Sequence, residues 1–334
     1  MARMDTPSII PGSARFKSMV VHPDAAGRAG AGASLRPTWE AIDWRRHQRW
    51  VLVDGRPINT IELAGAEPAL VFVHGLSGSW PNWLEQLAAF SGERRVVAMD
   101  LPGFGHSPGH AGEVSMPGYA HILQRLLGEL GLDRVVLVGN SMGGLISAEL
   151  AAGAPALVER LVLVSPAGLS TYENRLVARS MPAIRRLQQL LALGAMWTAS
   201  HSDAIAGRKR ARRLVLEGVV AHPERIPGPL AAEQLRGAGT DGFLSALEAI
   251  VEYDLEPRLE LIRCPALVVW GTKDRLVTVR DAPRFTAAIP NASEVVYEDT
   301  GHMAMLERPA EFNELLAWFI AEPPPAGAGG LGSP

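Results

Sequence analysis

The stretch VVLVGNSMGGL, residues 135–145, places Ser141 at the point where an aliphatic run ends and a helical pattern begins. The run at residues 135–138 is typical of a strand that is buried on both faces. The apolar spacing that resumes at Leu145 is typical of a helix. Ser141 therefore lies at a sharp turn between a strand and a helix, where it is either an exposed nucleophile or an ordinary helix cap.

Two glycines flank this serine at the same distance, Gly139 two residues before it and Gly143 two residues after it. Small residues at these positions let the strand and the helix pass closely, while the turn holds the serine in a strained conformation. The pattern G-x-S-x-G also occurs by chance, so it needs support from the rest of the chain.

A serine hydroxyl becomes a good nucleophile only when a base takes its proton and an acid orients that base. The sequence offers candidates for both, in the order serine, aspartate, histidine. Asp274 follows the aliphatic run ALVVWG, and His302 follows the run EVVYED with Gly301 just before it. Each candidate therefore stands just past a predicted strand.

Short aliphatic runs alternate with helical patterns along most of the chain. The runs are ALVFVHG, RRVVAMD, RVVLVGN, RLVLVSP, ALVVWG and EVVYED, and the helical patterns include NWLEQLAAF, YAHILQRLLGEL, LISAELAA and EFNELLAWFI. Strands that are apolar on both faces need helices on both sides, so we expect an open, mostly parallel α/β sheet. The stretch WVLVDGRPINTIEL predicts a hairpin that turns at Asp54 and Gly55.

The alternation breaks after Pro166, where helical patterns continue to about Thr240 without a convincing strand. A helical insertion after a strand's carboxyl end would lie over the edge of the sheet where ligands bind. We expect a disordered leader at residues 1–38, a core at 39–167 and 241–321, a helical cap at 168–240 and a disordered tail at 322–334. The leader and tail are assigned from their Gly, Ala and Pro content.

Composition describes an ordinary globular protein of 334 residues, with 47% hydrophobic residues and a net charge of −3. This balance gives no support for nucleic-acid binding. The chain has neither a run of about 18 apolar residues nor a signal-peptide pattern, so a cytoplasmic location is expected. Cys264 is the only cysteine, which excludes an intramolecular disulfide, and it is expected to be buried.

The predicted cap differs in charge from the rest of the chain. Residues 169–240 hold 11 Arg and Lys against 5 Asp and Glu, a local balance of +6. The basic run at residues 208–213 is expected to be the solvated face of a cap helix, with anionic-substrate steering or contact with an anionic surface as the alternative. Met181, Met196 and Trp197 are expected either to line an acyl pocket beneath the cap or to form the cap's own core.

The motifs together resemble the α/β-hydrolase superfamily over about residues 50–321. They are His74-Gly75, the run DLPGFGHS from Asp100 to Ser107, the serine turn, Gly271 with Asp274, and Gly301-His302. The resemblance implies that Ser141 is the nucleophile, His302 the base and Asp274 the acid. It implies two-step acyl transfer through an acyl-enzyme, with neither a metal nor an organic cofactor, and a rate that falls at acid pH as the base becomes protonated.

The same chemistry needs an oxyanion hole, because negative charge develops on the former carbonyl oxygen. We expect its two backbone N–H donors to come from Met142, which follows the nucleophile, and from Leu76, in the loop after VFVHG. His74 and Gly75 belong to this loop and are assigned to the substrate side, where His74 is expected to shape the loop by hydrogen bonding. Asp299 remains a minor alternative as the acid, and Asp100 is expected to have a structural role.

The remaining histidines show no partner pattern, apart from His106 in the Gly-rich turn, so we expect a surface or solvated position for each. They are His22, His47, His110, His121, His201 and His222.

A carboxylic ester of a small or medium hydrophobic compound is the expected substrate. The alternatives are a hydrolase of carbon–carbon bonds in ring-fission diketones, an acyltransferase or perhydrolase, and a receptor that binds a small molecule without turnover. The elbow GNSMGG fits the carbon–carbon hydrolases, whereas Met303 and the loop HGLSGSW depart from their pattern. The residues leave the acyl chain length and the oligomeric state open.

Overall fold

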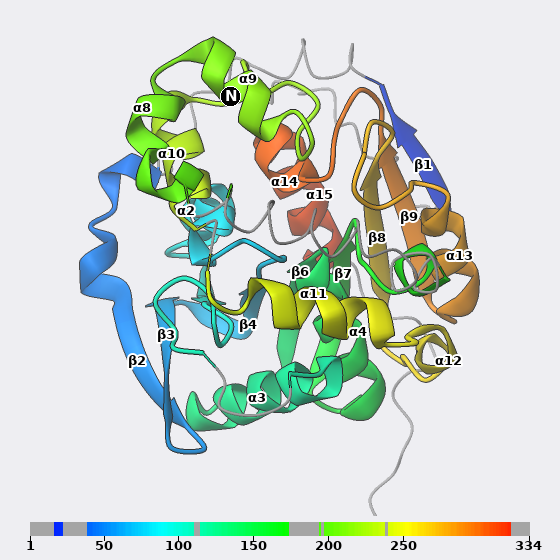
Figure 1. Ribbon diagram of the computed structural model, residues 1–334. Helices are drawn as coiled ribbons and strands as arrows, with labels where there is room; N and C mark the ends of the chain where they lie inside the picture. Colours follow the sequence, from blue (N-terminus) through cyan, green and yellow to red (C-terminus); the bar gives the residue numbers. More distant parts are fainter. Residues whose placement is uncertain are drawn as a thin grey trace, which may run out of the picture.

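A computed structural model describes residues 17–22, 39–109, 114–173, 194, 197–237 and 240–321. A nine-stranded sheet runs through the middle of the molecule, with helices on both of its faces (Figure 1). The strand order is β1-β9-β8-β7-β6-β4-β5-β3-β2. The strands are β1 Ser18–Val21, β2 Gln48–Val53, β3 Arg56–Leu63, β4 Ala66–Val73, β5 Arg94–Met99, β6 Val135–Asn140, β7 Val158–Val164, β8 Ala266–Gly271 and β9 Ala292–Tyr297.

The sheet is mostly parallel, as the sequence predicts. All neighbouring pairs from β1 to β5 in the strand order are parallel, while β3 pairs antiparallel with both β5 and β2. The antiparallel pair β2–β3 is the predicted hairpin, and both Asp54 and Gly55 in its turn have positive φ. The parallel arrangement brings the carboxyl ends of β4 to β9 to one edge of the sheet.

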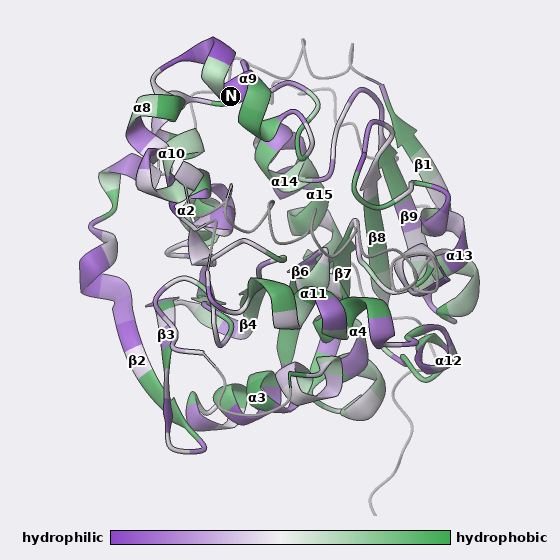
Figure 2. Cartoon of the chain, in the orientation of Figure 1, coloured by the Kyte–Doolittle hydropathy of each residue, from purple (hydrophilic) through white to green (hydrophobic). Residues whose placement is uncertain are grey.

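The central strands are aliphatic throughout because both of their faces are covered. In β6, Val135 and Leu137 join the core on one side of the sheet, and Val136 and Val138 join the core on the other side. Figure 2 shows this as hydrophobic colour along β6, β7 and β8. Successive side chains of a strand point to opposite faces, so two cores require an unbroken apolar run.

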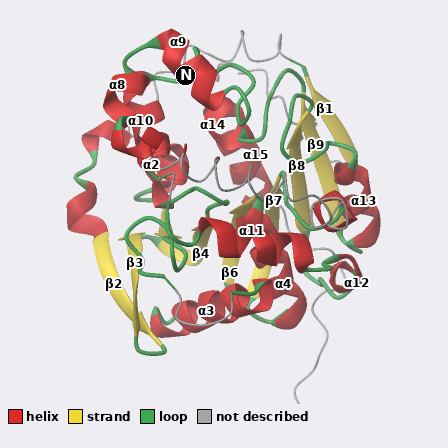
Figure 3. Cartoon of the chain, in the orientation of Figure 1, coloured by secondary structure: helices red, strands yellow, loops and turns green. Residues whose placement is uncertain are grey.

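Helices form the two outer layers (Figure 3). One core takes side chains from α3, α4, α11, α12 and α13, and the other takes them from α2, α8, α9, α10, α14 and α15. The helices are α2 Leu84–Phe90, α3 Met116–Glu129, α4 Met142–Gly153, α5 Ser170–Glu173, α8 Ser202–Ala206, α9 Lys209–Leu216, α10 Gly228–Arg236, α11 Phe243–Glu252, α12 Glu256–Leu259, α13 Asp281–Ala288, α14 Ala304–Glu307 and α15 Pro309–Ala321. The 3-10 helices are η1 Trp39–Ala41, η2 Trp44–His47 and η3 Trp80–Trp83.

The described residues between β7 and β8 contain helices and no strand. This segment contacts loops that follow the carboxyl ends of three strands. Gln234 of α10 accepts a hydrogen bond from Asn82 after β4, Gly242 donates one to Gly103 after β5, and Val219 accepts one from the backbone of His302 after β9. The helical segment is therefore attached to the edge of the sheet where ligands bind in α/β folds.

The structure contradicts part of the expected disordered leader. Residues 1–38 were expected to be disordered, but Ser18–Val21 forms β1, which pairs in parallel with β9. That part of the expectation is wrong, because only Val21 of the strand is buried and so short a run carries almost no apolar pattern. The expected tail at 322–334, Met181 and Met196 lie outside the described residues. Cys264 is buried, as expected.

Candidate active site

Ser141 occupies the turn between β6 and α4 in a conformation that L-residues rarely adopt, with φ 56° and ψ −117°. Its backbone is held on both sides. The N–H donates to the Val164 carbonyl at 3.0 Å, and its carbonyl accepts from Leu145 and Ala167 at 3.1 Å each. Strain of this kind persists only where surrounding bonds fix it, and it commonly marks a functional residue.

The flanking glycines are required by close backbone contacts. A Cβ on Gly139 would lie 2.3 Å from the Gly143 carbonyl oxygen, and a Cβ on Gly143 would lie 2.3 Å from the Val73 carbonyl oxygen. Because these neighbours are backbone atoms of the helix α4 and the strand β4, they cannot move aside for a side chain. The elbow therefore depends on glycine at both positions.

Asp274 and His302 meet at the ends of β8 and β9, as their places in the sequence predict. The Nδ1 atom of His302 lies 2.8 Å from Oδ2 of Asp274, and both side chains are buried. The other carboxylate oxygen of Asp274 accepts backbone hydrogen bonds from Leu276 at 2.9 Å and Val277 at 3.0 Å. A carboxylate fixed in this way accepts a hydrogen bond from Nδ1–H and leaves Nε2 of the imidazole as the free acceptor.

The loop of His302 is joined to the serine turn through Asn140. The Nδ2 atom of Asn140 donates to the Val164 carbonyl at 3.0 Å and to the His302 carbonyl at 3.3 Å. A Cβ on Gly271 would lie 2.2 Å from the carbonyl oxygens of Thr300 and Gly301, so glycine lets the loops after β8 and β9 approach. The predicted nucleophile, acid and base thus belong to three adjacent loops at one edge of the sheet.

The loop after β4 passes directly beside Ser141. A Cβ on Gly75 would lie 3.0 Å from the Ser141 Cβ and 3.2 Å from the Asn140 carbonyl oxygen. Leu76 is the next residue in this loop, and Met142 is the first residue of α4. The N–H groups in the first turn of a helix have no partner within the helix, so the N–H of Met142 suits an anion.

His74 holds this loop in place. Its ring is fully buried, Nε2 accepts from the Leu101 N–H at 2.9 Å, and Nδ1 lies 2.8 Å from the Gly75 carbonyl oxygen. Burial lowers the pKa of His74, against a smaller opposing effect of the nearby Asp100 carboxylate. Both ring nitrogens are occupied by backbone groups, which agrees with a loop-shaping role and leaves neither nitrogen to contact a substrate.

Asp100 has a structural role, as expected from its place at the end of a strand. Its buried carboxylate accepts from the backbone of Trp80 and His106 and from the side chain of Asn59. Burial disfavours its charge, but the hydrogen bonds outweigh burial and the pKa lies below its ordinary value. Asp100 therefore joins β3 to the loops after β4 and β5.

Asp299, the minor alternative for the acid, binds a different histidine. Its Oδ2 lies 2.7 Å from Nε2 of His222, while Asp274 contacts His302. His222 shows no partner pattern in the sequence and is expected at a surface or solvated position, but its side chain is partly buried and its partner is 77 residues away in the sequence. Sequence reasoning also missed Glu307, whose carboxylate contacts the backbone beside His302.

Relatives of the chain were found by three comparisons with known proteins. A family model described as alpha/beta hydrolase fold matches residues 68–309. An uncharacterized protein of Mycobacterium tuberculosis is 30% identical over 279 residues, which cover 79% of this chain and 78% of the relative. RutD of Escherichia coli, described by its name as a candidate carbamate hydrolase, is 30% identical over 253 residues, covering 75% of this chain and 88% of RutD.

Among solved structures, Est816, described as an N-acyl homoserine lactone degrading enzyme, is similar in both fold and sequence. It superposes with a TM-score of 0.62 and 27% identity, covering 81% of this chain and all of Est816. Within the described residues, no cluster of three or more metal-ligating side chains occurs. The described helices are also too short or too polar for a membrane span.

Proposed function

The chain belongs to the α/β hydrolase family, and from this premise we propose that it is a serine hydrolase of carboxylic esters of small or medium hydrophobic compounds. The observation that carries the proposal is the strained Ser141 elbow beside the hydrogen-bonded pair of Asp274 and His302. The likeness to Est816, whose description names a lactone substrate, supports ester chemistry because a lactone is a cyclic ester.

In the proposed first step, Nε2 of His302 takes the proton of Ser141 as its oxygen attacks the ester carbonyl. The contact between Nδ1 and Asp274 supports this step, because it fixes the tautomer in which Nε2 carries no proton. His302 then gives the proton to the leaving alcohol. In the second step it activates a water molecule, which releases the acid from Ser141.

The N–H groups of Met142 and Leu76 are proposed to stabilise the oxyanion of each tetrahedral intermediate. The position of Met142 at the start of α4 and the approach of Gly75 to Ser141 support this assignment. Residues 168–240 are proposed as a cap that forms the wall of the acyl pocket. The contacts of Gln234 and Val219 with loops at the sheet edge support the cap.

The test is hydrolysis of p-nitrophenyl esters of graded acyl length by the wild-type protein and by Ser141→Ala. We expect turnover of short and medium esters by the wild type, and loss of activity in the variant with an unchanged unfolding temperature. Equal inertness of both proteins toward every ester would refute ester hydrolysis. Turnover of a coloured ring-fission diketone with poor ester activity would favour the carbon–carbon hydrolase instead.

A further inference from the structure

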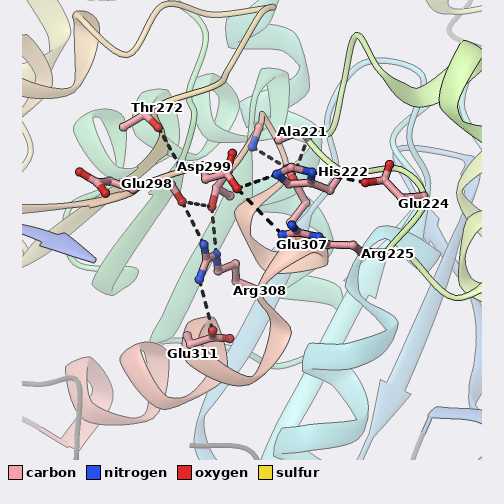
Figure 4. Close-up of polar contacts among 12 residues, drawn as sticks. Ala221, His222, Glu224, Arg225, Thr272, Glu298, Asp299, Glu307, Arg308 and Glu311 are labelled. Carbon is pink, nitrogen blue, oxygen red and sulfur yellow. Dashed lines mark hydrogen bonds and ion pairs between the residues drawn. The ribbon is translucent and has the colours of Figure 1, made fainter. Parts of the chain in front are cut away.

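Glu307, the last residue of α14, has its carboxylate inserted between two backbone segments that are far apart in the sequence. Oε1 accepts from the N–H of Gly301 at 2.8 Å, and Oε2 accepts from the N–H of Ala221 at 2.8 Å. Figure 4 shows Glu307 beside Ala221, with Asp299 and His222 next to them. One carboxylate thus binds both the residue before His302 and a residue of the helical segment between β7 and β8.

Two neighbouring contacts join the same segments. The N–H of His302 donates to the Val219 carbonyl at 2.9 Å, and Nε2 of His222 lies 2.7 Å from Oδ2 of Asp299. Residues 219–222 therefore attach to residues 299–302 at three places in succession. These contacts therefore help to hold the loop that carries the imidazole of His302.

The adjacent Arg308 fixes the other end of this loop. Its Nε donates to Oγ1 of Thr300 and its Nη2 donates to the Glu298 carbonyl, each at 3.0 Å. The Arg308 contacts lie within one part of the fold, whereas the Glu307 carboxylate spans two parts. Replacing Glu307 would therefore remove one contact of the helical segment and one contact of Gly301 together.

We infer that Glu307 is a positioning residue for His302, which ties the imidazole loop to the helical segment so that the seating of that segment sets the orientation of the base. This inference rests on the proposed function, because it takes His302 as the base. A carboxylate suits this position since both of its oxygens accept hydrogen bonds when it is ionised. A glutamine presents one acceptor and one donor, so one of the two N–H groups would lose its partner.

Burial disfavours the charged form of this carboxylate, while its hydrogen bonds favour it. Burial raises the pKa of Glu307 to about 7, and the hydrogen bonds from Ala221 and Gly301 oppose that rise. The charged and titratable groups that line the same pocket come from α2, from the segment before α10, from the loop after β9 and from the residue after Glu307. They are Glu85, His222, Arg225, Asp299 and Arg308.

The experiment compares Glu307→Gln with Glu311→Gln, which removes a carboxylate four residues later. Glu311 pairs with Arg308 at 3.5 Å and serves as a control for loss of charge near the same loop. For a p-nitrophenyl ester that the wild type hydrolyses, we expect kcat of Glu307→Gln to fall about tenfold or more, with KM changed less than about twofold. Glu311→Gln should keep the wild-type kcat.

A second measurement reads the base directly, whatever the substrate. The Nδ1 proton of His302, bonded to Asp274, is expected to give a downfield proton NMR signal that weakens or moves in Glu307→Gln and stays in Glu311→Gln. If Glu307→Gln does not fold, Glu307→Asp carries the test, since it keeps the charge but shortens the reach. An unchanged signal and kcat in the Glu307 variant, or equal losses in both glutamine variants, would overturn the inference.

The variant His302→Ala separates this inference from the proposed function. If it retains wild-type activity, the proposed function fails, and no role for Glu307 in positioning a base can stand. If it is inactive while Glu307→Gln matches the wild type in kcat and in the NMR signal, only the inference about Glu307 fails.

Discussion

The two carboxylate oxygens of Asp274 have different partners. Oδ2 contacts His302, and Oδ1 accepts backbone hydrogen bonds, so the amide variant changes one contact and keeps the other. In Asp274→Asn, Oδ1 can still accept from Leu276 and Val277, so the loop should keep its fold. The amide nitrogen, however, would face Nδ1 of His302 as a donor and favour the tautomer with the proton on Nε2. We expect kcat to fall about 10,000-fold, as in serine hydrolases whose acid is changed to the amide.

The measurement is the steady-state rate on a p-nitrophenyl ester, together with the unfolding temperature of the variant. A rate within about tenfold of the wild type would show that Asp274 does not set the tautomer.

Glu307 is also expected to make the stability of the folded protein depend on pH. Its pKa is raised by burial from 4.5 to about 7 in the folded protein, so the folded state binds more protons than the unfolded state between these pH values. This group therefore makes its whole contribution to the free energy of unfolding below about pH 4.5, and that contribution is lost as the pH rises to about 7. Glu307→Gln does not titrate, so its stability should depend less on pH there.

Urea unfolding at several pH values between about 5 and 7 checks this expectation, with the wild type and Glu307→Gln compared at each pH. Parallel curves for the two proteins would contradict the raised pKa. A steeper fall for the wild type would mean that the position beside Gly301 keeps its charge at some cost in stability.

At the scale of elements, the packing of α4 against the sheet depends on the absence of one methyl group. A Cβ on Gly143 would lie 2.3 Å from the Val73 carbonyl oxygen and 2.5 Å from that of His74. We expect Gly143→Ala to lower the free energy of unfolding by about 2 kcal/mol or more, because neither backbone can yield. Gly153→Ala, at the other end of α4, is the matched control.

At Gly153 the nearest atom to an added Cβ is a side-chain nitrogen of Arg258 at 3.6 Å, which is ordinary contact. Alanine there should be neutral or stabilising by about 0.5 kcal/mol, since alanine favours helix. Chemical denaturation of the two variants gives both values. Equal effects would mean that close packing at the elbow is not what selects glycine.

The strands from β4 to β9 could be predicted from the sequence. Burial on both faces requires an aliphatic run, which can be recognised without a structure. The serine elbow and the pairing of Asp274 with His302 could also be anticipated, since each follows such a run. The strand β1 could not, because only Val21 of its four residues is buried. A strand of four residues is too short to show a recognisable hydrophobic period.

At the scale of the whole molecule, the contacts that escaped prediction are those between distant parts of the chain. Glu307 and Ala221 are 86 residues apart, and His222 and Asp299 are 77 residues apart. One partner of Glu307 is a backbone N–H, which every residue except proline possesses, so no residue type marks it in the sequence. Such contacts emerge only once the fold has placed the helical segment against the loop after β9.

The two edge strands of the sheet, β1 and β2, differ in length and in the side chains that they expose. At one end β1 covers β9 with four residues, and Ser18 donates a hydrogen bond to Glu294 at 2.7 Å. At the other end β2 is six residues long and exposes Trp50 and Leu52. Because a short edge strand resists pairing and a longer one with exposed apolar side chains favours it, self-association of this protein through its sheet would begin at β2, well away from the elbow.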